Sequence, residues 1–163
     1  MKTVLLLRHA KSSWSNPSLA DINRPLNKRG KRDAPRIGEF LYQQDLIPDT
    51  ILCSPALRAR KTAKAIAEES GYPGEIEIYD DFYPGDPDSF IEVLSTLPDR
   101  IASALIVAHN PGLEEFLYTL SGESARMPTS ALAEISLAIE TWSEIDDDFE
   151  GKLINLWRVK ELG

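Results

Sequence analysis

The segment TVLLLRHA at residues 3–10 is an apolar run that ends abruptly on a cation and an imidazole. Its apolar residues do not alternate with polar ones, which is typical of a strand covered on both faces in a parallel sheet. A second run, SALIVAHNPG at residues 103–112, ends in the same way, and these two runs contain both histidines of the chain. Two buried strands that each end on histidine indicate chemistry at one edge of a sheet.

The remaining pattern alternates strands with helices. Further short apolar runs predict strands, and four apolar stripes with helical spacing lie between them. The predicted strands are Thr3–Arg8, Thr50–Cys53, Leu105–Ala108 and, with a weaker signal, Ile76–Tyr79. The helical stripes are Ala34–Leu41, Ala59–Ala67, Phe90–Leu97 and Leu113–Leu120. Pro35 should start or kink the first helix, while Asp86 and Pro87 suit the N-cap and first turn of the third.

The C-terminal part predicts a different pairing. Residues 131–139 and 152–159 read as two strands, and the acidic stretch SEIDDDFEG at residues 143–151 suggests a hairpin loop between them. We therefore expect an α/β fold: a three-layer sandwich with a mostly parallel central sheet flanked by helices and an antiparallel C-terminal addition. We expect residues 1–163 to form a single domain.

Composition narrows the possible partners. The chain of 163 residues is 42% hydrophobic and has a formal net charge of −8. This charge argues against non-specific binding to nucleic acid or to anionic membranes, and no apolar stretch approaches the ~20 residues of a membrane span. A lone cysteine, Cys53, cannot form an internal disulfide, which fits a reducing compartment. We expect a cytoplasmic monomer.

Polar residues follow three of the predicted strands at their carboxyl ends, where open α/β sheets bind ligands. They are Arg8 and His9, then Ser54 and Arg58, then His109 and Asn110. The guanidinium fork matches phosphate oxygens, and helix N-termini also favour anions. No carboxylate in these motifs is placed to neutralise the cations. The sequence predicts a phosphate pocket in which one neutral imidazole can act as a nucleophile.

These motifs resemble those of the histidine phosphatase superfamily, which includes the cofactor-dependent phosphoglycerate mutases. RHA at residues 8–10 is similar to the RHG signature, SPALRARKTA at 54–63 to the second motif, and AHNPG at 108–112 to the third. The short length, the HNPG run and RPLNKRG at 24–30 resemble the small SixA-type phosphohistidine phosphatases. The resemblance covers essentially the whole chain and implies a phosphoglycerate mutase-like fold.

The resemblance implies a role for each matching residue. His9 attacks phosphorus and becomes phosphohistidine, while Arg8, Arg58 and His109 hold the phosphoryl oxygens; Asn110 and Ser12 complete the expected substrate-binding set. His9 must be neutral to attack, so we expect its other ring nitrogen to be fixed by a main-chain carbonyl or a carboxylate. No metal or organic cofactor is expected. The expected partner is a phosphorylated protein or a small phosphorylated substrate.

Two departures from the family pattern matter. Ala10 replaces a glycine, so the turn after His9 should avoid a backbone conformation that only glycine adopts. Larger relatives carry a glutamate proton donor after the third strand, where this chain reads IYDDFYPGDPDSF at residues 78–90. Asp81 or Asp86 could substitute, although Asp86 also suits a helix cap. The labile bond of N-phosphohistidine needs less acid help, which favours phosphohistidine as substrate.

Alternatives stay open at this point. A general phosphomonoesterase of the same family fits the motifs, as does a binding module without catalysis. Lys11, Ser12 and Trp14 either line the mouth of the pocket or pack against their own domain, and Arg24 either faces substrate or ties down its loop. A cysteine phosphatase loop is disfavoured, because the sixth residue after Cys53 is Ala59 instead of arginine. No insertion large enough to cap the site is present, which suits a phosphate displayed on another protein.

Overall fold

A computed structural model of the protein describes residues 1–146 and 148–162. The expected alternation of strands and helices is confirmed. The strands are β1 (Lys2–Arg8), β2 (Thr50–Cys53), β3 (Ile76–Ile78), β4 (Ser103–Ala108), β5 (Leu132–Leu137) and β6 (Gly151–Trp157). The α-helices are α1 (Lys28–Gln43), α2 (Leu57–Ser70), α3 (Pro87–Leu94) and α4 (Gly112–Ser121). Short 3-10 helices are η1 (Asp21–Asn23), η2 (Asp80–Phe82), η3 (Trp142–Asp146) and η4 (Val159–Glu161).

The strands form one sheet in the order β3-β2-β4-β1-β5-β6. The pairs β2–β3, β2–β4 and β1–β4 are parallel, whereas β5 is antiparallel to both β1 and β6. The mostly parallel sheet and its antiparallel C-terminal addition are therefore confirmed.

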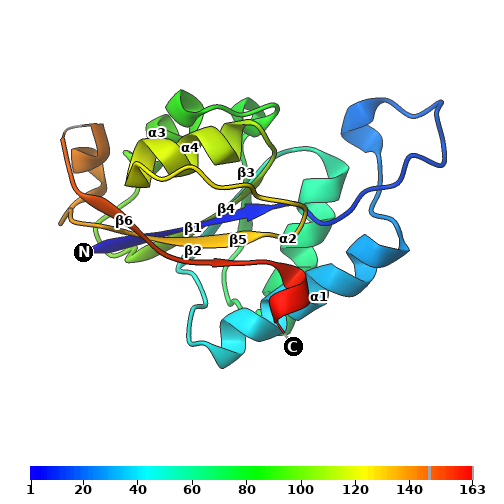
Figure 1. The fold of residues 1–163 in the computed structure, drawn as a ribbon, viewed down its shortest axis with the longest axis horizontal. Helices are drawn as coiled ribbons and strands as arrows, with labels where there is room; N and C mark the ends of the chain where they lie inside the picture. The colour runs from blue at the N-terminus through cyan, green and yellow to red at the C-terminus, as the bar shows by residue number, and fades with distance from the viewer. Residues whose placement is uncertain (147, 163) are drawn as a thin grey trace.

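Helices cover both faces of this sheet, as Figure 1 shows: α3 and α4 lie on one face, and α1 and α2 on the other. Each interface has its own buried apolar cluster. Phe82, Phe90 and Phe116 belong to the cluster under α3 and α4, while Ile37, Leu41 and Ile66 belong to that under α1 and α2. This three-layer arrangement explains why the central strands are apolar on both faces. In the described part of the chain, no helix is long and apolar enough to span a membrane.

The sequence signals predicted the start of α3 correctly and the start of α1 incorrectly. The Asp86 carboxylate accepts a hydrogen bond from the Ser89 amide at 2.8 Å and Pro87 opens α3, as predicted. Of the two alternatives for Pro35, a helix start is wrong: Pro35 lies inside α1, which begins at Lys28, where the Asn27 side chain accepts from the Gly30 amide at 2.9 Å. The acidic connection before β6 contains η3, and Asp147 within it lies outside the described residues.

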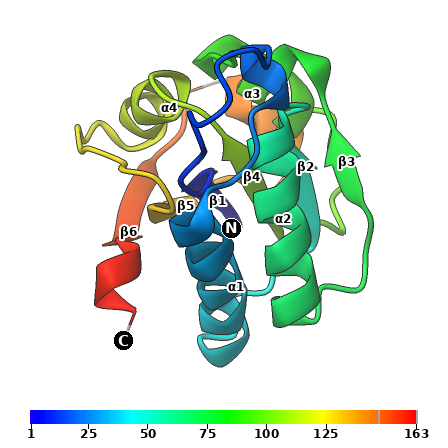
Figure 2. The same cartoon turned by 90° about the vertical axis from the view of Figure 1, so that its right-hand side faces the viewer.

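The parallel register fixes which residues meet at the carboxyl edge. Arg8 is the register partner of Ala108, and the His9 amide donates to the Ala108 carbonyl at 3.2 Å. The residues that follow, His9 and His109, therefore leave neighbouring strands at the same level. Cys53 pairs with Val107, so Ser54 emerges beside them. Figure 2 views the molecule from this end of the sheet.

Candidate active site

The His9 ring is buried and held in one tautomer by its own loop. Its Nδ1 lies 2.8 Å from the Ala10 carbonyl oxygen, which can only accept, so Nδ1 carries the hydrogen. The predicted anchoring of the second ring nitrogen is confirmed. The Nε2 lone pair then faces the Arg58 Nε–H at 3.4 Å. Ala10 has no positive φ, as its replacement of glycine requires, and its amide donates to Thr62 Oγ1 at 3.0 Å.

His109 lies beside His9, with 5.0 Å between the ring centroids. Its Nε2 is 2.7 Å from Ser54 Oγ, and that same hydroxyl oxygen accepts from the Ala56 amide at 3.1 Å. The other ring nitrogen, Nδ1, is buried and has no hydrogen-bond partner among the described residues. The β2 end therefore orients His109, and one nitrogen of that ring is free to meet a ligand.

Both imidazoles are held neutral. Burial lowers the pKa of His9 to about 4, and the positive charges of Arg58, Arg8 and Arg24 add to the effect. Burial likewise lowers the pKa of His109 to about 3, with further contributions from His9 and Arg58. Desolvation and nearby cations both disfavour the imidazolium form. A neutral His9 keeps its Nε2 lone pair at neutral pH, which is what a nucleophile requires.

The prediction that no carboxylate neutralises the arginines is wrong for Arg58. Its Nη2 lies 3.0 Å from Asp21 Oδ2 and its Nη1 donates to the Asp21 carbonyl at 2.8 Å. Asp21 reaches the site from η1, in the loop between β1 and α1. The same carboxylate accepts from Tyr83 Oη at 2.6 Å and from Arg24 Nη1 at 3.0 Å. These hydrogen bonds, led by that of Tyr83, hold the pKa of Asp21 well below its usual range.

Asp21 and Tyr83 are site residues that the motifs do not reveal. Tyr83 follows η2, in the segment where larger relatives carry glutamate, and its ring packs edge-on against His109 with 5.6 Å between centroids. The one sequence signal for Asp21 is its spacing of three residues from Arg24. Neither residue follows a strand directly, so the strand-end rule could not find them.

Arg24 and Ser12 tie the long loop to the site. The Arg24 side chain donates to Ser12 Oγ at 2.6 Å and to the Ser13 carbonyl at 3.0 Å. Its guanidinium also stacks on Trp14, 3.2 Å from the ring centroid. A small cavity lies at the strand ends, and its lining includes Lys11, Ser12, Trp14 and Arg24. The two alternatives for Arg24 are thus both realised: it fixes its loop and it faces the cavity.

Arg8 and Asn110 share a support on the opposite side. Arg8 Nη1 donates to the Met127 carbonyl at 3.2 Å, and Asn110 Nδ2 donates to the same oxygen at 2.8 Å. The Glu114 carboxylate accepts from Asn110 Nδ2 at 2.9 Å and from the Met127 amide at 2.7 Å. Glu114 therefore holds the segment before β5 against α4 and orients both side chains.

These groups enclose a small cavity of about 190 Å³. It is lined by Arg8, His9, Lys11, Ser12, Trp14, Arg24, Arg58, His109, Asn110 and Thr129. Three of these residues each carry a buried polar atom that has no hydrogen-bond partner among residues 1–146 and 148–162: Arg8 Nε, His109 Nδ1 and Asn110 Oδ1. Because unpaired buried polar atoms are costly, their convergence indicates a site built for a polar ligand. Cations dominate the lining, so that ligand is an anion.

The two candidate proton donors lie elsewhere. Asp81 in η2 and Asp86 at the start of α3 are both exposed, and neither lines the catalytic cavity. Asp86 is engaged as the α3 cap. Cys53 is fully buried, and burial raises the pKa of its thiol to about 12. A thiol that stays protonated cannot serve as a nucleophile, which confirms the rejection of cysteine chemistry.

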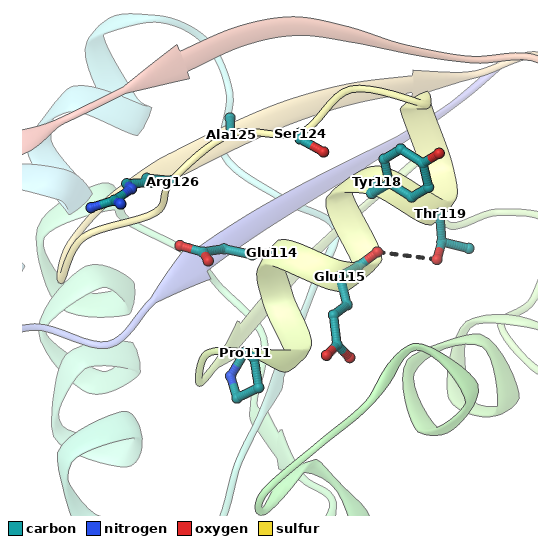
Figure 3. A pocket seen from close by; sticks show the side chains of 8 residues that line it. All are labelled: Pro111, Glu114, Glu115, Tyr118, Thr119, Ser124, Ala125 and Arg126. Carbon is teal, nitrogen blue, oxygen red and sulfur yellow. Dashed lines mark hydrogen bonds between the residues drawn. The ribbon is translucent and has the colours of Figure 1, made fainter.

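A wider cavity, of about 740 Å³, lies along α4 and shares no lining residue with the cavity at the strand ends. Figure 3 shows Glu114 reaching from α4 toward the segment that carries Arg126, while the Glu115 side chain points away from that segment. The ionisable side chains there include Glu114, whose carboxylate is already engaged by Met127 and Asn110. The residues of the three sequence motifs, Arg8, His9, Arg58 and His109, lie in the smaller cavity at the strand ends.

The comparisons with known proteins agree with this geometry. The model of the histidine phosphatase superfamily (branch 1) matches residues 4–83. An uncharacterized phosphatase of Bacillus subtilis, PhoE, is 30% identical over 181 residues, which cover 87% of this chain and 92% of that protein. The chain belongs to the histidine phosphatase superfamily, and its class of activity is that of a phosphatase.

Within the superfamily, the chain is similar to SixA proteins. Phosphohistidine phosphatase SixA of Escherichia coli is 28% identical over 138 residues, covering 82% of this chain and 84% of that protein. The structure of a protein histidine phosphatase SixA complexed with tungstate matches with a TM-score of 0.86 and 24% identity over 99% of both chains. The phosphoglycerate mutase-like fold and the resemblance to SixA are thus confirmed.

Proposed function

We propose that this phosphatase acts through a covalent phosphohistidine on His9 and that its preferred substrate is phosphohistidine on another protein. The observation that carries the proposal is the Nδ1 contact of His9 with the Ala10 carbonyl at 2.8 Å, which leaves Nε2 as the free nucleophile. Arg58 adjoins that nitrogen at 3.4 Å and can bind a phosphoryl oxygen when substrate enters. Three further groups of the cavity, Arg8, Arg24 and His109, would hold the remaining oxygens.

The proposed reaction has two steps. In the first, the Nε2 lone pair of His9 forms a bond to phosphorus, and the bond from phosphorus to the substrate imidazole breaks with its electron pair leaving on that imidazole. In the second, water attacks the phosphoryl group of His9, the N–P bond breaks, and its electron pair returns to Nε2. The proton released by water leaves on the phosphate product.

His109 would act as a hydrogen-bond donor in both steps. If the Ser54 hydroxyl donates to Nε2, the hydrogen of neutral His109 resides on Nδ1, the nitrogen that has no protein partner. A fixed N–H aimed at the phosphoryl group stabilises negative charge in the transition state. Ser12 and Asn110 are proposed to complete the binding set, Ser12 partly through its hydrogen bond with Arg24.

Two observations support phosphohistidine over an alkyl ester. A protonated phosphohistidine ring leaves as neutral imidazole, so it needs no acid from the enzyme, and neither Asp81 nor Asp86 lines the cavity. The cavity of about 190 Å³ is also smaller than the roughly 300–1,000 Å³ of typical small-molecule sites. A phosphoryl group that projects from a protein surface fits such a site better than an enclosed metabolite.

The test is to trap the intermediate. The protein is mixed with a peptide carrying labelled phosphohistidine and quenched in base, and the label is mapped by mass spectrometry. We expect a base-stable, acid-labile phosphoryl group on His9 and none in His9→Ala. A label on His109, or turnover by His9→Ala, would contradict the assignment. Equal turnover of a phosphoserine peptide would indicate a general phosphomonoesterase, and absence of turnover on any phosphate would indicate a binding module.

A further inference from the structure

Positive charge is concentrated in one part of this acidic chain. Residues 24–64 contain ten of its 18 lysines and arginines but only four of its 26 acidic residues. That segment comprises α1, β2 and most of α2, and these two helices form the layer on one face of the sheet (Figure 1). Charge asymmetry of this size within one chain points to interaction with a charged partner.

The asymmetry is sharpest at the start of α1. Four of the first five positions of the helix are exposed cations, Lys28, Arg29, Lys31 and Arg32, and its first turn contains no acidic residue. Cations are unfavourable at a helix N-terminus, where the helix dipole favours acidic residues. The helix dipole therefore does not favour this composition, which points to a role in binding.

The start of α1 is tied to the loop that carries Lys11 at the cavity. The Asn27 amide donates to the Lys11 carbonyl at 3.0 Å, and Ser12 and Leu26 form a β-bridge. Lys11 is exposed and lines the catalytic cavity. We define Lys11, Lys28, Arg29, Lys31 and Arg32 as the basic patch. Figure 2 shows the start of α1 directly below the loop that follows β1.

Most of this charge remains uncompensated. Asp33 is buried and lies within 4.0 Å of Arg29, Arg32 and Arg36, so a single carboxylate serves three guanidiniums. Among the described residues, no carboxylate forms an ion pair with the ammonium groups of Lys11, Lys28 or Lys31. The patch therefore presents net positive charge to a partner.

We propose that the basic patch docks an acidic surface of the phosphorylated substrate protein beside its phosphorylated residue. The proposal rests on the function proposed above and adds the chemistry of the partner. Opposite charges on the two surfaces would steer encounter and orient the phosphoryl group toward His9. The net charge of −8 disfavours a nucleic acid or an anionic membrane as the occupant.

The test uses the double variant Lys28→Glu/Lys31→Glu. Neither residue lines the catalytic cavity, and acidic residues suit the first turn of a helix, so the variant should fold. The matched control is Arg100→Glu/Lys152→Glu, which changes the net charge equally at the opposite end of the sheet. Arg100 precedes β4, and Lys152 pairs with Ser136, the register partner of Thr3 near the start of β1.

Two phosphohistidine peptides serve as substrates, one flanked by aspartates and one by lysines. At low ionic strength we expect Lys28→Glu/Lys31→Glu to lower kcat/KM for the aspartate peptide about tenfold or more, with little change in the control. The loss should shrink at high salt, where the Debye length falls to about 3 Å. Hydrolysis of an aryl phosphate should change less than about twofold, since that substrate makes no contact with the patch.

The affinities of peptides that carry no phosphate test the docking surface independently of the proposed substrate. Affinities for the same peptides without phosphate are measured by fluorescence anisotropy, with a DNA duplex as a further probe. We expect tighter binding of the aspartate peptide, lost in Lys28→Glu/Lys31→Glu only. Equal binding of both peptides, or tighter binding of DNA, would overturn the docking surface. Hydrolysis of the aryl phosphate without hydrolysis of phosphohistidine would contradict the proposed substrate. The binding measurements would then decide whether the basic patch is a docking surface.

Discussion

The strand ends and the loop between β1 and α1 supply the same cavity by different physical means. His9 and His109 are placed by the register of β1 and β4, in which Arg8 pairs with Ala108. Asp21 and Arg24 are instead placed by side-chain hydrogen bonds to Arg58, Tyr83 and Ser12. A strand end is fixed by a whole buried sheet, whereas the loop is fixed by a few polar contacts. The strand ends should therefore carry the chemistry and the loop should tune it.

The largest effect is expected at Arg58, in the first turn of α2. Arg58→Ala removes the guanidinium next to His9 Nε2 and should lower kcat/KM by about 10²–10³, as loss of one preorganised donor does elsewhere. Arg60→Ala is the matched control, because Arg60 is exposed and bonds only to the Pro55 carbonyl among the described residues. Steady-state kinetics with an aryl phosphate would check both. Equal losses in the two variants would place Arg58 outside the machinery.

The pKa values of the two histidines test whether the strand ends form a buried site. Both histidines should titrate well below the usual 6.5, near pH 4 for His9 and near pH 3 for His109, because they are buried among cations. NMR of labelled histidine can follow them individually, since the chain has just two. Added phosphate should raise both midpoints, because an anion stabilises the imidazolium. A midpoint near 6.5 in the free protein would contradict the buried site.

The free energy of unfolding should depend on the protonation of the same two histidines. The unfolded chain binds protons on its histidines below pH 6.5, whereas the folded chain resists protonation until about pH 4 for His9. The free energy of unfolding should therefore fall as pH drops from 6.5 toward 4, and His9→Gln should remove part of that slope. Urea denaturation at a series of pH values measures it.

A smaller effect is expected from the loop. Asp21→Asn keeps the size of the side chain but removes the charge shared by Arg58 and Arg24. Because the Asp21 side chain is 46% exposed, we expect a loss of only about tenfold in kcat/KM. The loss should largely vanish in an Arg58→Ala background if Asp21 acts by positioning Arg58. Asp81→Asn, at an exposed aspartate outside the cavity, is the control.

The same contrast explains what the sequence could predict. The strands, their parallel order and the meeting of Arg8, His9, Arg58 and His109 follow from apolar runs with polar ends, and these are local signals. Asp21 and Tyr83 could not be predicted, because their positions depend on contacts between segments about 60 residues apart. The start of α1 depends on the Asn27 cap, whereas the proline signal used to predict it, Pro35, lies inside the helix. Asp86 was correctly read as a cap, since capping depends only on neighbouring residues.

The smallest effect on activity is expected at the Asp86 cap, and it tests whether Asp86 lies outside the site. Asp86→Ala removes the acceptor of the Ser89 amide and should cost about 1 kcal/mol of stability in urea unfolding. It should leave kcat unchanged, whereas loss of a true general acid typically costs about 10²–10⁴ in rate. Asp88→Ala, in the same first turn, is the control for helix charge. A large loss of kcat in Asp86→Ala alone would mean that α3 moves toward His9 during turnover, and the strand ends would then no longer account for the chemistry by themselves.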